Sequence, residues 1–170
     1  MTEQIQTDRL VIRALEDEEL AEFLSVYLSN QEYLALVEGS GGEPGHYDLE
    51  MLQRDVALAR LTPGRVVAGM RRKTSGDPVG ILDWLDSNPS DGYPWIGLVL
   101  IDAARQRQGL GSEAVEGLLT ETGWPAVRAG VIERNAAGLA LVRRLGFAEI
   151  GSTEQKLTVG AERILLYERS

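Results

Sequence analysis

The sequence predicts a mixed α/β domain, and three observations lead to this prediction. Short segments that alternate apolar and polar residues, as half-buried strands do, are interspersed with segments whose apolar residues recur at helical spacing. Breaks rich in Gly and Pro separate these segments. The 170 residues are 44% hydrophobic and 25% charged, which is ordinary for a globular protein, and the length suits a single domain over residues 1–170.

The first two predicted elements are a strand and an amphipathic helix. Residues 10–15 alternate apolar and polar side chains as far as Arg13, which predicts a strand. Residues 16–28 are predicted to form a helix, because acidic residues fill the first turn and apolar residues follow at helical spacing. These apolar residues are Leu20, Phe23, Leu24, Tyr27 and Leu28.

A glycine-rich loop and a second helix come next. Residues 38–45 contain four Gly and one Pro, which is typical of a loop. Asp48 belongs to the residue types favoured at an N-cap, so a helix is predicted from there to about residue 61. Its apolar face consists of Leu49, Leu52, Val56 and Ala59.

The remaining residues are predicted to alternate between strands and helices. The run from Trp95 to Ile101 is continuously apolar, which predicts a central strand buried on both faces. The predicted strands are 65–71, 78–85, 93–101, 126–132, 147–153 and 163–169. The predicted helices are 109–122 and 136–145.

Composition and charge exclude several classes of function. The chain has no Cys and one His, so disulfides are excluded and a metal site of the usual zinc type is not expected. The formal charge of −9 argues against a nucleic-acid partner and slightly favours a cationic one. No apolar run is long enough for a membrane span and no signal peptide is recognisable, so a cytoplasmic location without membrane attachment is expected.

Residues 101–114, with the sequence IDAARQRQGLGSEA, carry the clearest chemical signal. A strand ends, a short loop follows, and Gly109 and Gly111 open a helix. Free N–H groups and the helix dipole make such a start an anion site, and glycine lets the backbone approach the anion closely. Arg105 and Arg107 add donors, so a pyrophosphate fits this segment. The alternative is a helix entry that merely contains Gly, with two solvated Arg side chains.

A dinucleotide-binding site is a second alternative for the same segment. Residues 109–114 match the pattern G-x-G-x-x-A, and Glu133 follows at roughly the distance of a ribose-binding carboxylate. Two features oppose it: residues 102–108 separate the strand from the first Gly, and too little chain follows for a doubly wound sheet. The P-loop pattern G-x-x-x-x-G-K-[ST] is absent.

Two motifs together resemble the GCN5-related N-acetyltransferase (GNAT) superfamily. Residues 106–111, QRQGLG, are similar to the family's pyrophosphate loop Q/R-x-x-G-x-G/A. Residues 135–147, NAAGLALVRRLGF, are similar to its N-x-x-A…L-G-F stretch. Residues 7–13 and the Glu113-Ala114 pair further resemble the branch of ribosomal-protein N-terminal acetyltransferases (RimJ/RimL-like).

The resemblance implies a fold, a cosubstrate and a reaction. It implies a predominantly antiparallel sheet with helices on both faces and a splay between the fourth and fifth predicted strands. It also implies acetyl transfer from acetyl-CoA, without a metal, to a primary amine of a small molecule or a peptide N-terminus, and a homodimer is possible. The residues implied to bind the cosubstrate are Val99, Leu100, Ile101, Gln106, Arg107, Gln108, Gly109, Leu110, Gly111, Ser112 and Asn135.

The catalytic groups are less well defined by the sequence. Glu133 and Asp83 are the candidate bases, and the alternative for each is a structural or surface carboxylate. The family's usual Tyr acid is replaced by Val142, and Gly138 stands where the N-terminal branch often has Ser, so no general acid is assigned. A non-catalytic acyl-CoA-binding or interaction module therefore stays open as an alternative function.

Several other residues are candidates for the acceptor side. His46 and Tyr93 are weaker candidates for the base. Residues 38–46 form a candidate flap over the acceptor, because long loops beside a rigid scaffold often determine specificity. The aromatic residues that are candidates to line an acceptor cleft, or else to pack in the core, are Tyr33, Tyr47, Trp84 and Trp95.

Overall fold

The computed structural model describes residues 3–38, 46–157 and 160–170. Within them an eight-stranded sheet runs in the order β1-β2-β3-β4-β5-β6-β8-β7. The strands are β1 (Ile5–Gln6), β2 (Leu10–Ala14), β3 (Arg65–Arg72), β4 (Pro78–Leu85), β5 (Trp95–Ile101), β6 (Val127–Ile132), β7 (Ala148–Leu157) and β8 (Gly160–Arg169). The helices are η1 (Asp17–Glu19), α1 (Leu20–Ser29), α2 (Gln31–Glu38), α3 (Leu49–Arg60), η2 (Ala103–Arg105), α4 (Leu110–Thr122) and α5 (Ala136–Arg144).

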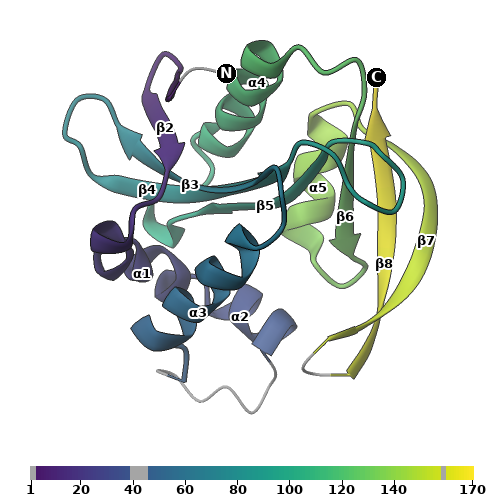
Figure 1. Cartoon of the computed structure of the whole chain (residues 1–170), viewed down its shortest axis with the longest axis horizontal. Coiled ribbons are helices and arrows are strands. Elements are labelled where there is room, and N and C mark those ends of the chain that lie inside the picture. Colours follow the sequence, from purple (N-terminus) through teal and green to yellow (C-terminus); the bar gives the residue numbers. More distant parts are fainter. Residues whose placement is uncertain (1–2, 39–45, 158–159) are drawn as a thin grey trace.

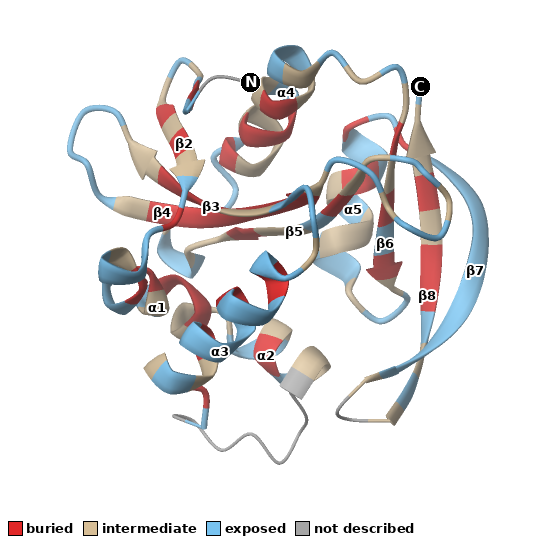
Figure 2. Ribbon diagram, in the orientation of Figure 1, coloured by how far each residue is buried: buried red, intermediate tan, exposed pale blue. Residues whose placement is uncertain are grey.

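Helices cover both faces of the sheet, as predicted (Figure 1). On one face α1, α2 and α3 enclose a core cluster around Phe23, Leu52 and Ile81. On the other, α4 and α5 enclose a second cluster that includes Leu118 and Phe147. Figure 2 shows the buried residues concentrated along the middle strands and the inner faces of these helices. The mixed α/β fold with a predominantly antiparallel sheet is confirmed.

The N-terminal half follows the prediction except in three places. The predicted helix at 16–28 begins as the short 3-10 helix η1, and β1 is an additional strand. α2 is also additional. It was not predicted because its sequence lacks a clear amphipathic stripe, and only Leu34 of its apolar residues is buried. α3 begins where predicted, because the Asp48 carboxylate accepts a hydrogen bond from the Met51 N–H at 2.9 Å.

The C-terminal hairpin is longer than the sequence pattern predicts. β7 and β8 remain paired from Ala148↔Glu168 to Leu157↔Gly160. Almost every residue of β7 is exposed, so this edge strand has no buried face whose alternation marks its full length. β8 continues the sheet on its other side by pairing with β6.

β5 and β6 form the one parallel pair of the described sheet, and they separate after two residues. Pairing is confined to Trp95↔Arg128 and Ile96↔Ala129. The prediction that β5 is buried on both faces is therefore wrong: Ile96 and Leu100 are buried, but Gly97 is exposed and the other residues are half-buried. β5 has no β6 residues beside it beyond Ile96, and this leaves the rest of the strand partly exposed. The splay implied by the family resemblance is confirmed.

Candidate functional site

The start of α4 has the conformation of an anion-binding turn. Gly109 is the N-cap residue with φ +77°, and Arg107 also has a positive φ, +63°, which is uncommon outside glycine. The first helical hydrogen bond runs from the Glu113 N–H to the Gly109 carbonyl at 3.0 Å. The amides of Leu110, Gly111 and Ser112 precede that bond, so three N–H groups stand at this helix end.

Side chains from distant parts of the chain hold this turn in place. Arg9 donates from Nη1 to the Gln108 carbonyl at 2.9 Å and from Nε to Glu113 Oε2 at 2.6 Å. The Gln106 amide donates to Asn30 Oδ1 at 2.8 Å and to the Ile101 carbonyl at 3.0 Å. Gln108 Oε1 accepts a hydrogen bond from Arg72 Nη2 at 3.0 Å. Both Gln side chains that flank Arg107 therefore form hydrogen bonds within the protein.

Gly111 places the start of α4 against the opening between the strands. A Cβ added at Gly111 would lie 3.5 Å from Val99 Cγ1, 3.6 Å from Ile101 Cγ1 and 3.8 Å from Leu141 Cδ1. A longer side chain would therefore project between β5 and α5. The neighbouring Ser112 hydroxyl is buried and has no hydrogen-bond partner among the described residues, which suits a site that binds a group from outside the chain.

Asn135 has a structural function at the start of α5. Its Oδ1 accepts a hydrogen bond from the Gly138 N–H at 3.0 Å and so caps the helix. A Cβ at Gly138 would lie 2.8 Å from Asn135 Nδ2, which explains why a side chain is disfavoured there. Val142 is buried in the core and supplies no proton donor.

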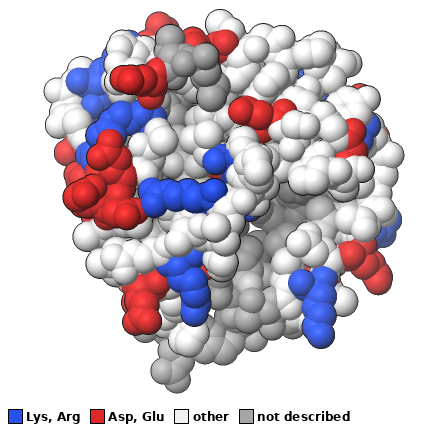
Figure 3. Space-filling model, viewed as in Figure 1, with Lys and Arg blue, Asp and Glu red and all other residues white. Residues whose placement is uncertain are grey.

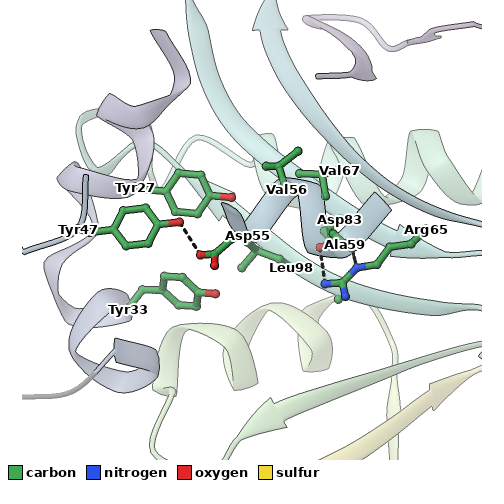
Figure 4. A pocket seen from close by; sticks show the side chains of 11 residues that line it. Tyr27, Tyr33, Tyr47, Asp55, Val56, Ala59, Arg65, Val67, Asp83 and Leu98 are labelled. Carbon is green, nitrogen blue, oxygen red and sulfur yellow. Dashed lines mark hydrogen bonds and ion pairs between the residues drawn. The ribbon is translucent and has the colours of Figure 1, made fainter. Parts of the chain in front are cut away.

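A cavity of about 230 Å³ opens on the α1–α3 face of the sheet, beside the point where β5 separates from β6. Gly97 and Leu98, which follow the last paired residue Ile96, line it. The cavity is otherwise lined by tyrosines, charged residues and small apolar residues of α1, α2, α3, the segment just before α3, β3 and β4 (Figure 4). Those residues are Tyr27, Tyr33, Tyr47, Asp55, Val56, Ala59, Arg65, Val67 and Asp83.

Asp83 is the buried charge of this cavity, with 6% of its surface exposed. Its two carboxylate oxygens accept from Arg65, from Nε at 3.1 Å and from Nη2 at 2.8 Å. This hydrogen bond raises the pKa of Arg65, with burial opposing it. A bidentate pair fixes the orientation of the carboxylate and leaves a lone pair on each oxygen for a further donor.

Asp55 is the second carboxylate of the cavity and lies at its exposed side. Tyr47 donates to Asp55 Oδ2 at 2.8 Å, and the rings of Tyr47 and Tyr27 are stacked with centroids 5.5 Å apart. Burial is the largest cause that raises the pKa of Tyr27, and Tyr33, Asp83 and Asp55 act in the same direction. The positive charge of Arg65 acts in the opposite direction on the pKa of Tyr27.

The structure separates the two predicted bases. Asp83 lies in the cavity, whereas Glu133 is exposed after β6, outside the cavity lining, where it pairs with Arg163 at 3.5 Å. Of the weaker candidates, His46 is exposed, and the Tyr93 ring lies 3.7 Å from the guanidinium carbon of Arg128. Neither lines the cavity. Most of the predicted flap, residues 39–45, lies outside the described residues.

Of the predicted aromatic residues, two line the cavity. Tyr33 and Tyr47 do so, whereas Trp84 is buried in the core and Trp95 donates to Asp91. Sequence reasoning missed Tyr27, Asp55 and Arg65, because they come from separate elements and no local motif marks them.

Acidic and basic side chains are interspersed on the face shown in Figure 3. On the side of η1 and α1 the acids are paired with arginines, such as Arg71 with Glu19 at 3.0 Å and with Glu22 at 2.7 Å. Within residues 3–38, 46–157 and 160–170, no cluster of three His, Cys, Asp or Glu is placed to hold a metal ion. No helix in that part of the chain is long and apolar enough to cross a membrane.

Comparison with solved structures shows the same fold. An acetyltransferase of Salmonella typhimurium that modifies the N-terminal serine of the 50S subunit protein L7/L12 superposes with a TM-score of 0.79, at 17% identity over 98% of both chains. An acetyltransferase from Thermus thermophilus superposes with a TM-score of 0.75, at 23% identity over 98% of both chains. A ribosomal L7/L12 α-N-protein acetyltransferase in complex with coenzyme A superposes with a TM-score of 0.78, at 18% identity over 98% of this chain and 97% of that one.

Sequence comparison identifies the family. No curated protein matches this chain. Residues 9–148, most of the chain, match the family described as the acetyltransferase (GNAT) domain. This match includes both motifs and the strands that separate beside them. The chain belongs to the GNAT acetyltransferase family and is an acetyltransferase that uses acetyl-CoA.

Proposed function

We propose that this acetyltransferase acts on a primary amine that enters the cavity beside Gly97 and Leu98. The observation that carries the proposal is the position of that cavity. It opens where pairing between β5 and β6 ends, and the α4 turn borders the same opening from the other face of the sheet. Two entrances, one on each face, let the two reactants meet at β5, and such positioning lowers the barrier by several kcal/mol.

The residues at the α4 turn fit the cosubstrate. The amides of Leu110, Gly111 and Ser112 suit the pyrophosphate. From Val99 to Ile101, β5 pairs with β4 but not with β6, and this second edge suits the amides of the pantetheine arm. The Arg107 side chain is exposed beside this turn and available to a phosphate. Acetyl-CoA supplies a thioester, so the amine nitrogen forms a bond to the acetyl carbon, the carbon–sulfur bond breaks, and coenzyme A leaves as the thiol.

Asp83 is the proposed acceptor of the proton that the amine must lose. A protonated amine has no free lone pair, and alkylamines are mostly protonated at neutral pH, so a group near the nitrogen must take a proton. Asp83 is the one carboxylate that is both buried and in the described lining of the cavity. Arg65 holds it in a fixed orientation with two hydrogen bonds.

Substitution of the two candidate carboxylates tests this proposal. Asp83→Asn keeps the shape but removes the base, and we expect kcat/KM to fall at least 100-fold, the usual contribution of general acid–base catalysis. Glu133→Gln is the matched control and is expected to stay within about threefold of the wild type. Thermal unfolding and coenzyme A binding by calorimetry show whether each variant is folded. A larger loss for Glu133→Gln than for Asp83→Asn would contradict the assignment.

The primary amine can belong to a small molecule or to a protein N-terminus, which is the second candidate class of acceptor. The structurally similar Salmonella typhimurium enzyme modifies an N-terminal serine, which favours this class. The cavity is open to solvent at Asp55, so an extended chain end has a path to Leu98. Acetylation of a panel of peptides and small amines, monitored by release of free thiol, separates the two classes by their kcat/KM.

A further inference from the structure

We infer that the acceptor carries a second cationic group, as a diamine does, and that Asp55 and the tyrosines of the cavity bind this group while the other amine reacts. This inference rests on the proposed function and specifies its substrate class.

The charges of the cavity lining sum to one negative charge. Asp83 and Arg65 neutralise each other through their bidentate pair. Asp55 accepts a hydrogen bond from the neutral Tyr47, and none of the described Lys or Arg residues forms an ion pair with it. The reacting amine must be uncharged to attack. Transfer of a proton from the reacting amine to Asp83 leaves the Asp55 charge unchanged, so a second, protonated nitrogen of a diamine can pair with Asp55, whereas a simple monoamine leaves Asp55 without a cation.

The arrangement of the tyrosines around Asp55 also suits a cationic group. Figure 4 shows Tyr27, Tyr33 and Tyr47 around Asp55, with their hydroxyl groups pointing toward its carboxylate. Tyr27 and Tyr47 are stacked, so their arrangement is fixed before a ligand arrives. Aromatic rings and phenol oxygens beside a carboxylate form a favourable environment for an ammonium group.

The two ends of the cavity differ in burial, and each suits a different nitrogen of the diamine. Asp55 is exposed, whereas Asp83 is buried, and Figure 4 shows Asp83 and Arg65 away from the three tyrosines. The position of Asp83 opposite Leu98 in the β4–β5 register places it beside the strand opening. The neutral amine therefore belongs near Asp83, and the protonated one stays at the exposed side.

The volume of the cavity suits a short acceptor. Water occupies about 30 Å³ per molecule in the liquid, so 230 Å³ holds about eight atoms of that size. A diamine with four to six carbons has about that many non-hydrogen atoms. The apolar residues Val56, Ala59 and Val67 of the lining suit the methylene groups of such a chain.

A comparison of three amines with the wild-type enzyme tests the inference. Diaminobutane, aminobutanol and butylamine share a four-carbon chain and differ at the far end, which is cationic, neutral polar or apolar. At saturating acetyl-CoA we expect kcat/KM for the diamine to exceed the other two about tenfold, equal to about 1.4 kcal/mol. A pair of dipeptides, Ser followed by Lys or by Leu, shows whether a peptide side chain supplies the second cation equally well.

Asp55→Asn is the variant that isolates the carboxylate. We expect the ratio of diamine to aminobutanol to fall from about ten to about two, and calorimetry with coenzyme A present to show weaker diamine binding. Glu50→Gln, which removes an exposed charge from the same helix outside the cavity, is the control and should leave the ratio unchanged. The wild-type comparison needs no variant, so it stands even if Asp55→Asn does not fold.

The outcomes separate this inference from the proposed function. Equal kcat/KM for the diamine and aminobutanol, with both acetylated, would overturn the inference and leave the proposed function intact. Acetylation of other primary amines but of none that carry a second cation would do the same. Failure to acetylate any primary amine would remove the proposed function itself.

Discussion

Gly111 and Asp83 are the two residues on which the site depends most. Gly111 leaves space between α4, β5 and α5, and Asp83 brings an oriented carboxylate to the opposite face of the same opening. Each has a simple physical reason for its identity. Any longer side chain at Gly111 would occupy the opening, and a neutral side chain at Asp83 would leave the Arg65 guanidinium without its partner.

Substitution of Gly111 by Leu tests the opening at the level of one residue. A Cβ there meets atoms at ordinary contact distances, so Gly111→Ala is expected to fold and to keep most of its affinity for coenzyme A. The longer Leu side chain extends between Val99 and Leu141, and we expect it to weaken coenzyme A binding at least tenfold in calorimetry. Equal affinities of the Leu variant and the wild type, with both folded, would show that the opening is not used.

At the level of elements, the important contact is between the N-terminal strands and α4. Glu113, in the first turn of α4, accepts from the Thr7 hydroxyl at 2.6 Å, from the Arg9 amide at 2.8 Å and from the Arg9 guanidinium. Gly117, one turn further on, lets β1 and the following Thr7 approach, since a Cβ there would lie 2.7 Å from Thr7 Cγ2 and 3.4 Å from Ile5 Cγ2. These contacts anchor the helix whose first amides form the proposed pyrophosphate site.

The Glu113 anchor gives the stability a specific pH dependence. Burial acts to raise the pKa of Glu113, but the bonds from Thr7 and Arg9 outweigh it and lower the pKa below its ordinary value of 4.5. A lowered pKa in the folded state means that the contribution is complete above the unfolded pKa and is lost as the pH falls through the folded pKa. We therefore expect Glu113→Gln to destabilise the protein by about 1 kcal/mol at pH 7 and by less below pH 4.

Denaturant unfolding of the wild type and Glu113→Gln at several pH values measures this difference. Glu116→Gln is the matched control, because Glu116 lies on the same helix and pairs with Arg169 at the surface. An exposed pair of this kind contributes about 0–1 kcal/mol. A difference between wild type and Glu113→Gln that grows as the pH falls would contradict the sign of the predicted linkage.

For the whole molecule, the sequence predicted the backbone at the start of α4 better than the lining of the cavity. Residues 106–111 form a continuous motif, so the position of Gly109 and Gly111 at the start of a helix could be predicted. The cavity joins Tyr27, Asp55, Arg65 and Asp83 from α1, α3, β3 and β4. Only tertiary packing brings these residues together, and a single sequence carries little information about it. Asp83 was predictable because a charge inside an apolar strand is unusual.

The fold shows the same division between local and tertiary information. β2, β4 and α3 were predicted closely because alternation, turn residues and the Asp48 cap are encoded within each segment. The exposure of β5 was not predicted, because it depends on where β6 stops pairing, about thirty residues later in the chain. The opening between β5 and β6 is therefore a property of the sheet as a whole.

A crystal structure of the protein with coenzyme A bound tests the central claim most directly. We expect the pyrophosphate against the amides of Leu110, Gly111 and Ser112, the pantetheine arm along Val99–Ile101, and the thiol sulfur facing the cavity that contains Asp83 and Leu98. Coenzyme A bound outside the opening between β5 and β6, or a sulfur atom that points away from that cavity, would contradict the account.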